Sequence, residues 1–140
     1  MTPELREKLI GLGNTGNPFD THNGLRVADV GEGTATVEVA LQHENLNSWG
    51  GPHGGLLFTM ADVACGLATI SLRQEVCVTV NATMDFIAAA GGEGVIRAEG
   101  KVLHCGRKMC FCSAEVFDEK DTLLSRLNVT MYFPGRKLEI

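Results

Sequence analysis

The pattern of apolar and polar positions divides this chain into helical and strand segments. Near the N-terminus, Thr2-Pro3-Glu4 is typical of a helix start, because threonine caps a helix and proline fits its first turn. From residue 24 onward, many apolar residues alternate with polar ones, which is the two-residue period of half-buried strands. The expected elements are a helix from Pro3 to Gly11 or Gly13, a loop over 14–23, hairpin strands over 24–30 and 33–41, a helix over 54–72, and strands over 76–87, 95–104, 109–117 and 123–133.

The segment 54–72 differs from the others because it is apolar on almost every side. A helix of this kind belongs in a hydrophobic core. Its only ionisable side chain before the C-terminal end is Asp62, and a buried carboxylate without a partner costs several kcal/mol. Either Asp62 is satisfied by Thr59, Thr69 or a neighbouring strand, or its carboxylate takes part in chemistry.

A single apolar helix between a hairpin and four further strands is best buried when an antiparallel sheet curls around it. The predicted fold class is therefore α+β, in the hotdog arrangement, with the order α-β-β-α-β-β-β-β and the last four strands in a meander. Strands at the sheet edge can pair with a second copy across a two-fold axis. We expect one domain over residues 1–140, assembled as a homo-oligomer.

Composition narrows the function classes. The chain has 44% hydrophobic and 21% charged residues, which is typical of a globular domain, and polar residues interrupt its longest apolar run, so we expect no membrane span. It has no recognisable signal peptide, and we expect a cytoplasmic protein. Five cysteines without a CxxC motif indicate reduced, packed thiols, and the histidines lack metal-ligand spacing. A net charge of −5 without a basic stripe disfavours nucleic acid as a partner.

A glycine-rich approach, Asn47-Ser48-Trp49-Gly50-Gly51-Pro52-His53-Gly54-Gly55, leads into the apolar helix. The first backbone N–H groups of a helix have no intrahelical partner, so they attract anions and developing negative charge. Gly54 and Gly55 are therefore candidate contacts for an electrophilic substrate. One continuous segment thus carries a possible oxyanion donor and, at Asp62, a possible base or nucleophile.

The stretch 47–66 has an Asn six residues before a His, then His-Gly-Gly, and an Asp eight residues after the first Gly. This motif resembles the acyl-CoA thioesterases of the hotdog superfamily, in particular the phenylacetate-degradation (PaaI-type) branch. The resemblance implies hydrolysis of an acyl-CoA to the free acid and coenzyme A, with no cofactor apart from the coenzyme A of the substrate. It implies that Asp62 attacks the thioester carbonyl or activates water, that the Gly54 N–H polarises the carbonyl, and that Asn47 orients the carbonyl or the water. Thr79 corresponds to a Ser or Thr that holds the attacking water in relatives.

Further candidates each have two interpretations. His53 is a possible catalytic base, although a His at a Gly-Gly helix start is favoured to orient the loop. Trp49 and Phe86 either line the acyl channel or simply pack. Arg107 and Lys108 form a basic turn that is solvated or, as the resemblance implies, contacts the phosphates of coenzyme A.

Helix geometry predicts where each active site lies. Eight residues of helix separate Gly54 from Asp62, which is about 12 Å along the axis, whereas the attacking oxygen and the oxyanion donor must both lie roughly 3 Å from one carbonyl group. We therefore expect dimers with active sites shared between two subunits, and possibly a dimer of dimers (a homotetramer). The alternative function is a non-catalytic acyl-CoA binder or sensor on the same fold. The sequence leaves the acyl group and the choice between general base and anhydride mechanisms open.

Overall fold

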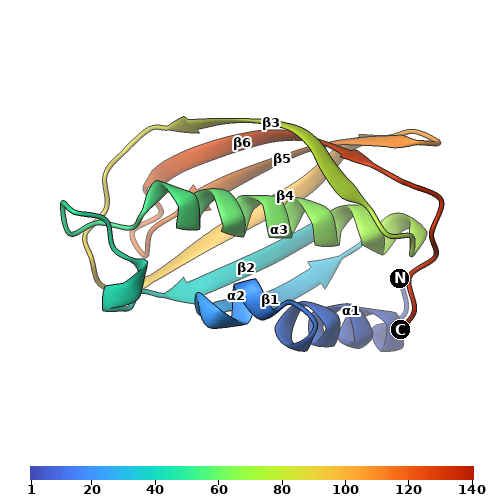
Figure 1. The fold of residues 1–140 in the computed structure, drawn as a ribbon, viewed down its shortest axis with the longest axis horizontal. Helices are drawn as coiled ribbons and strands as arrows, with labels where there is room; N and C mark the ends of the chain where they lie inside the picture. The colour runs from blue at the N-terminus through green and yellow to red at the C-terminus, as the bar shows by residue number, and fades with distance from the viewer.

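A six-stranded antiparallel sheet curls around the long helix α3 (Gly54–Arg73) in the computed structural model, which describes residues 1–140 (Figure 1). The strand order across the sheet is β1-β2-β4-β5-β6-β3. The expected α+β hotdog fold is therefore confirmed. The strands are β1 (Leu25–Gly31), β2 (Thr34–Ala40), β3 (Val78–Phe86), β4 (Val95–Cys105), β5 (Met109–Phe117) and β6 (Leu123–Tyr132).

The expected four-stranded meander is wrong at its first strand. Only β4, β5 and β6 pair consecutively, whereas β4 joins the hairpin strand β2 and β3 pairs with β6 at the far edge of the sheet. A strand that directly follows α3 can run back alongside the helix, and the next connection then crosses to the other side. Consecutive strands are neighbours in most sheets but not in all, and the local pattern carries no information about this choice.

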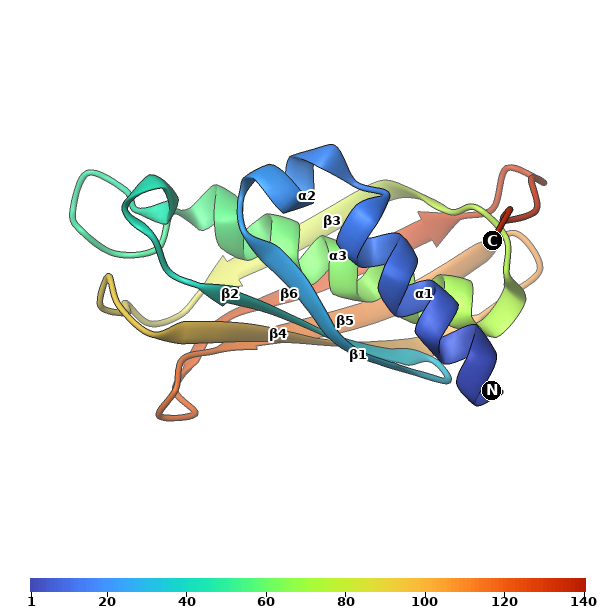
Figure 2. The ribbon, with the colours of Figure 1, turned by 90° about the horizontal axis from the view of Figure 1, so that it is seen from below.

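Two short helices cover one side of the molecule. Helix α1 (Pro3–Thr15) is capped by Thr2, whose hydroxyl accepts a hydrogen bond from the Leu5 N–H at 3.1 Å. The segment predicted as a loop contains a second helix, α2 (Pro18–His22), because Asn17 caps its N-terminus and Pro18 occupies its first turn. Figure 2 shows both helices lying over β1 and the adjoining part of α3.

Helix α3 forms the centre of the core. Met60, Ala61, Ala64 and Ala68 have no exposed surface. On the facing strand β4, Gly100 lies so close that a Cβ atom there would be 2.7 Å from the carbonyl carbon of Ala64. The absence of a side chain at this position thus allows β4 and the helix to approach at the turn that follows Asp62.

Helix α3 also corrects the expectation that no segment is apolar enough to span a bilayer. With 20 residues and a mean hydropathy of 1.7, it meets that criterion by length and composition. However, 56% of the apolar segment is buried inside the protein. The core helix of a globular domain has the same properties, so the length and hydropathy of α3 are explained by its position in the core.

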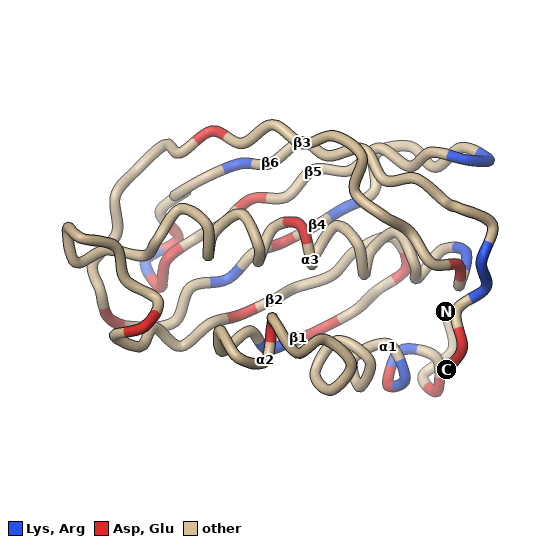
Figure 3. The backbone as a smooth tube through the Cα atoms, viewed as in Figure 1, with Lys and Arg blue, Asp and Glu red and all other residues tan.

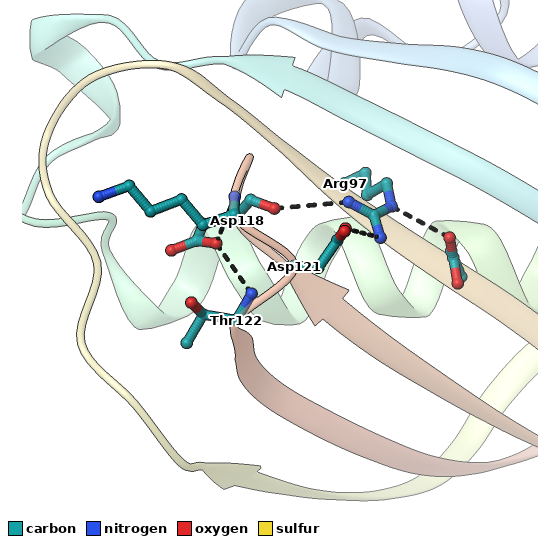
Figure 4. A network of polar contacts seen from close by, with 6 residues as sticks. Arg97, Asp118, Asp121 and Thr122 are labelled. Atoms are coloured by element: carbon teal, nitrogen blue, oxygen red, sulfur yellow. Dashed lines mark hydrogen bonds and ion pairs between the residues drawn. The ribbon is translucent and has the colours of Figure 1, made fainter.

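The turn between β5 and β6 is held against β4 by a polar network (Figure 4). The Arg97 guanidinium donates to Asp121 at 2.7 Å and to the carbonyl oxygen of Asp118 at 3.4 Å. The Asp118 carboxylate accepts the backbone N–H groups of Thr122 and Lys120, both at 2.9 Å, and the bond from Thr122 does most to hold the pKa of Asp118 below its ordinary value. This network holds the β5–β6 turn in place against β4.

Candidate active site

The loop before α3 is folded by its own polar side chains. Asn47 Oδ1 accepts the N–H groups of Trp49 at 2.9 Å and Gly51 at 3.2 Å, so this oxygen shapes the loop. His53 caps α3, because its Nδ1 accepts the N–H of Gly55 at 2.8 Å. The N–H of Gly54, by contrast, makes no hydrogen bond within the chain. The helix start therefore presents one free donor, at the position predicted to polarise a carbonyl.

A cavity of about 470 Å³ opens beside this free donor and includes Asn47, Trp49, Gly54 and Phe86 in its lining. The Trp49 side chain is 92% exposed and that of Phe86 is 60% exposed, so neither residue is part of the core. Phe86 nevertheless lies close to the helix start, since a Cβ atom at Gly54 would be 3.1 Å from its ring. The structure thus brings four of the predicted site residues together around an open, largely apolar cavity.

Asp62 lies eight residues, or about two helical turns, after Gly54 along α3. Its Oδ1 accepts a hydrogen bond of 2.6 Å from the hydroxyl of Thr79 on β3. Burial raises the pKa of Asp62, and the bond from Thr79 acts in the opposite direction. Thr59 and Thr69 direct their hydroxyls to Gly55 O and to cysteine thiols instead. Of the hydrogen-bond partners that the sequence suggested for Asp62, only the neighbouring strand provides one, the Thr79 hydroxyl.

Asp62 is half-buried rather than fully buried. The sequence pattern suggested complete burial because the helix is apolar all round, but the sheet does not enclose this side of α3. The adjacent part of β3 is at the edge of the sheet, and Val78, Thr79 and Val80 are exposed. The Asp62–Thr79 pair is therefore accessible from the open edge.

A second cavity, of about 280 Å³, contains the Asp62–Thr79 pair and is closed on the other side by α1 and α2. Its lining includes Asp20 of α2, a buried carboxylate that the sequence reasoning did not identify. The Asn-Pro pair at 17–18 is a helix-start signal that could have located α2. No feature of the local sequence pattern indicated that Asp20 would be buried beside α3.

Within one chain, Gly54 and Asp62 line different cavities. Strand β3 runs along α3 past both of them, with Thr79 beside Asp62 and Phe86 beside Gly54 (Figure 1). One copy therefore holds the oxyanion donor and the carboxylate apart, as the helix length predicted.

The basic turn with Arg107 and Lys108 lies at the opposite end of α3 from Gly54. Arg73, the last residue of α3, donates to the carbonyl oxygens of Gly106 at 2.9 Å and Arg107 at 2.6 Å. Figure 3 shows this basic tip of the β4–β5 hairpin beyond the C-terminal end of the helix. Both side chains are exposed, and within one chain they line neither cavity.

Comparison with known proteins identifies the family. The family model described as the thioesterase superfamily matches residues 50–125, more than half of the chain, including the start of α3, Asp62 and Thr79. The chain belongs to the thioesterase superfamily. The predicted enzyme class, a thioester hydrolase, is thereby confirmed.

Solved structures of PaaI proteins and of a thioesterase-type protein are similar to this chain. The PaaI protein from the phenylacetic acid degradation operon of E. coli superposes with a TM-score of 0.88 over 95% of this chain and 96% of that one, and at 20% identity this shows a shared fold. A mutant of PaaI from Thermus thermophilus is 26% identical, with a TM-score of 0.78 over 84% and 99% of the two chains. A thioesterase-type protein from Streptococcus pneumoniae, crystallised with coenzyme A, is 25% identical, with a TM-score of 0.77 over 85% and 94%. The family predicted from the motif is confirmed.

Proposed function

We propose that this thioesterase hydrolyses an acyl-CoA thioester to the free acid and coenzyme A. The observation that carries the proposal is the free N–H of Gly54, which lies at the positive end of α3 and beside a largely apolar cavity. Such a donor stabilises an oxyanion, and an apolar cavity suits an acyl group. The coenzyme A in the related Streptococcus pneumoniae structure supports this class of substrate.

In the proposed mechanism, Asp62 supplies the second function. As a general base it takes a proton from a water molecule that Thr79 helps to hold, and the hydroxide attacks the thioester carbonyl; as a nucleophile it forms an anhydride that water then opens. In both cases negative charge develops on the carbonyl oxygen, where the Gly54 N–H and the helix dipole stabilise it. Collapse of the resulting tetrahedral intermediate expels the coenzyme A thiolate, and in the nucleophilic route this expulsion forms the anhydride before water opens it. Asn47 and His53 contribute by holding the loop and the helix start in place.

We further propose that two copies complete each active site. Strand β3 is an unpaired edge, and Val78, Val80 and Phe86 on it are 45%, 51% and 60% exposed. Pairing this edge with its own copy would extend the sheet, cover these apolar side chains, and set two α3 helices antiparallel. Asp62 of one subunit would then approach Gly54 of the other, which a single chain cannot achieve.

The same assembly gives roles to the remaining candidates. Trp49 and Phe86 would contact the acyl group from the Gly54 cavity, where both are open to solvent in one chain. Arg107 and Lys108, at the far end of α3, would approach the partner's helix start, where they could bind the phosphates of coenzyme A.

A thiol-release assay tests the proposed hydrolysis. Aryl, short-chain, medium-chain and long-chain acyl-CoAs are incubated with the wild type and with Asp62→Asn, and free coenzyme A is titrated with a thiol reagent. We expect release by the wild type with at least one class and a loss in the variant. The alternative, a non-catalytic binder, predicts tight acyl-CoA binding by calorimetry without thiol release from any class.

Subunit exchange tests the shared site. Inactive Asp62→Ala subunits are mixed with subunits inactivated at Asn47, which shapes the loop beside Gly54. A mixed dimer contains one site with both functions intact, so part of the activity should return. Mass spectrometry of differently tagged subunits establishes that exchange has occurred. If mixed dimers form and remain inactive, the two functions do not come from different subunits.

A further inference from the structure

Asp20 is a buried carboxylate in the same cavity as Asp62, and the proposed reaction assigns it no role. We propose that Asp20 is a positioning residue for thioester hydrolysis, whose negative charge faces Asp62 and increases the tendency of Asp62 to accept a proton from water. This inference rests on the proposed function, because it concerns the base strength of Asp62. Asp20 lies outside the segment that the family model matches.

The local structure places the Asp20 side chain firmly. Helix α2 begins at Pro18, and Asn17 Oδ1 accepts the backbone N–H of Asp20 at 3.3 Å. Asp20 is only 3% exposed, although it lies in a helix of five residues near the surface. Its carboxylate forms no ion pair, and the one side chain that stabilises its charge is that of Asn17 at the start of the same helix. A buried carboxylate without a cation beside it is costly, and the cost has to be explained.

No cation faces Asp20 across the cavity. The other titratable groups in the lining are Asp62 and the thiol of Cys77, and the residues contributed by α1 and its C-cap are Leu12, Gly13 and Gly16. Burial raises the pKa of Cys77 to about 12, so this thiol is neutral at physiological pH. The basic side chains of α1 and β1, which pack against α2, are engaged at the surface in three ion pairs, Arg6 with Asp29, Lys8 with Glu4, and Arg26 with Glu38.

The electrostatic consequence follows from this environment. Burial and the neighbouring charge of Asp62 raise the pKa of Asp20 to about 6, against a smaller opposite effect of the Asn17 side chain. At neutral pH Asp20 is therefore ionised beside Asp62. Because the interaction of two charges is reciprocal, Asp20 also favours the protonated form of Asp62 once the pH is above about 6 and Asp20 is ionised. A stronger base at Asp62 accepts the proton of the attacking water more readily.

The pH dependence of hydrolysis tests this role. kcat/KM for the best acyl-CoA is measured from pH 4.5 to 9 for the wild type, Asp20→Asn and Asp20→Glu. Asp29→Asn is the matched control, because it removes the same charge from an exposed carboxylate on β1. Thermal melting of each protein at each pH restricts the comparison to folded enzyme.

We expect the wild-type profile to rise in a step near pH 6, where Asp20 ionises and strengthens Asp62 as a base, and we expect the Asp20→Asn profile to lack this step. The plateau should fall by roughly three- to tenfold, because a weaker base transfers protons more slowly. Asp20→Glu should retain a step, because it keeps the carboxylate, and Asp29→Asn should match the wild type.

Two results would overturn the inference. The first is a folded Asp20→Asn variant whose profile keeps the step near pH 6, and the second is an equal loss of that step in Asp29→Asn. A wild type that releases no thiol at any pH would refute the proposed function instead, so the two failures are distinguishable.

Discussion

Replacing Gly100 by alanine would test whether the close approach of β4 and α3 positions Asp62. The new Cβ would lie 2.7 Å from the carbonyl carbon of Ala64 and 2.9 Å from the backbone nitrogen of Cys65. These are backbone atoms, so no side-chain rotation relieves the contact. Helix and strand would have to separate by about 0.8 Å to reach an ordinary carbon–carbon distance of about 3.5 Å.

The magnitude follows from the cost of overpacking a core. Forcing such a displacement costs about 1–3 kcal/mol, which lowers the melting temperature of a domain of this size by roughly 3–10 °C. Because Ala64 lies two residues after Asp62, the carboxylate should move relative to Thr79. A misplacement of about 1 Å can reduce the rate on the order of 100-fold, so kcat should also fall at temperatures where the variant is folded.

Differential scanning calorimetry and thiol release on the same preparations measure both effects. Gly11→Ala is the control, because a Cβ atom at Gly11 in α1 meets no atom within 4 Å. It should leave activity unchanged and raise stability by up to about 1 kcal/mol, the helix preference of alanine over glycine. A Gly100→Ala protein that melts and hydrolyses like the wild type would refute the positioning role of this contact.

Three further predictions follow from the site. Asp62→Asn should reduce kcat by about 10²–10⁴-fold while leaving the melting temperature unchanged or higher, since burial disfavours the charged form; a variant that melts far below the wild type yet retains hydrolysis would make Asp62 structural. Replacing Arg107 and Lys108 together by Glu should raise KM more than it lowers kcat, and added salt should raise the wild-type KM, because exposed phosphate contacts are screened; a salt-independent KM would remove both residues from the site. The folded pKa of Asp20, about 6, lies above its ordinary value of 3.8, so its protonated form favours folding, and that stabilisation is present below pH 4 and lost as the pH rises through 6. In denaturant titrations, the wild type should therefore gain up to roughly 3 kcal/mol relative to Asp20→Asn between pH 7.5 and pH 4, and equal pH dependence of the two proteins would contradict this reasoning.

Local patterns in the sequence determined most of the secondary structure and the family. The predicted start of α3 and the bounds of β5 agree with the structure, and the end of α3 differs by about one residue. Helical periodicity, strand alternation and glycine turns are local properties, so they can be recognised without knowing the fold. The residues from Asn47 to Asp62 were also recognisable, because the helix start and the carboxylate belong to one continuous segment.

Contacts between distant segments decided the rest. The sequence did not show that β3 would pair with β6, because strand neighbours depend on packing around α3 rather than on the strand itself. It identified Asp62 and Thr79 separately, but only the folded chain brings these residues, 17 positions apart, into a hydrogen bond of 2.6 Å. Asp20 was overlooked for the same reason. The residues next to Asp20 in the sequence resemble a polar loop. Asp20 becomes a buried carboxylate, in the same cavity as Asp62, only when α2 packs over the open side of α3.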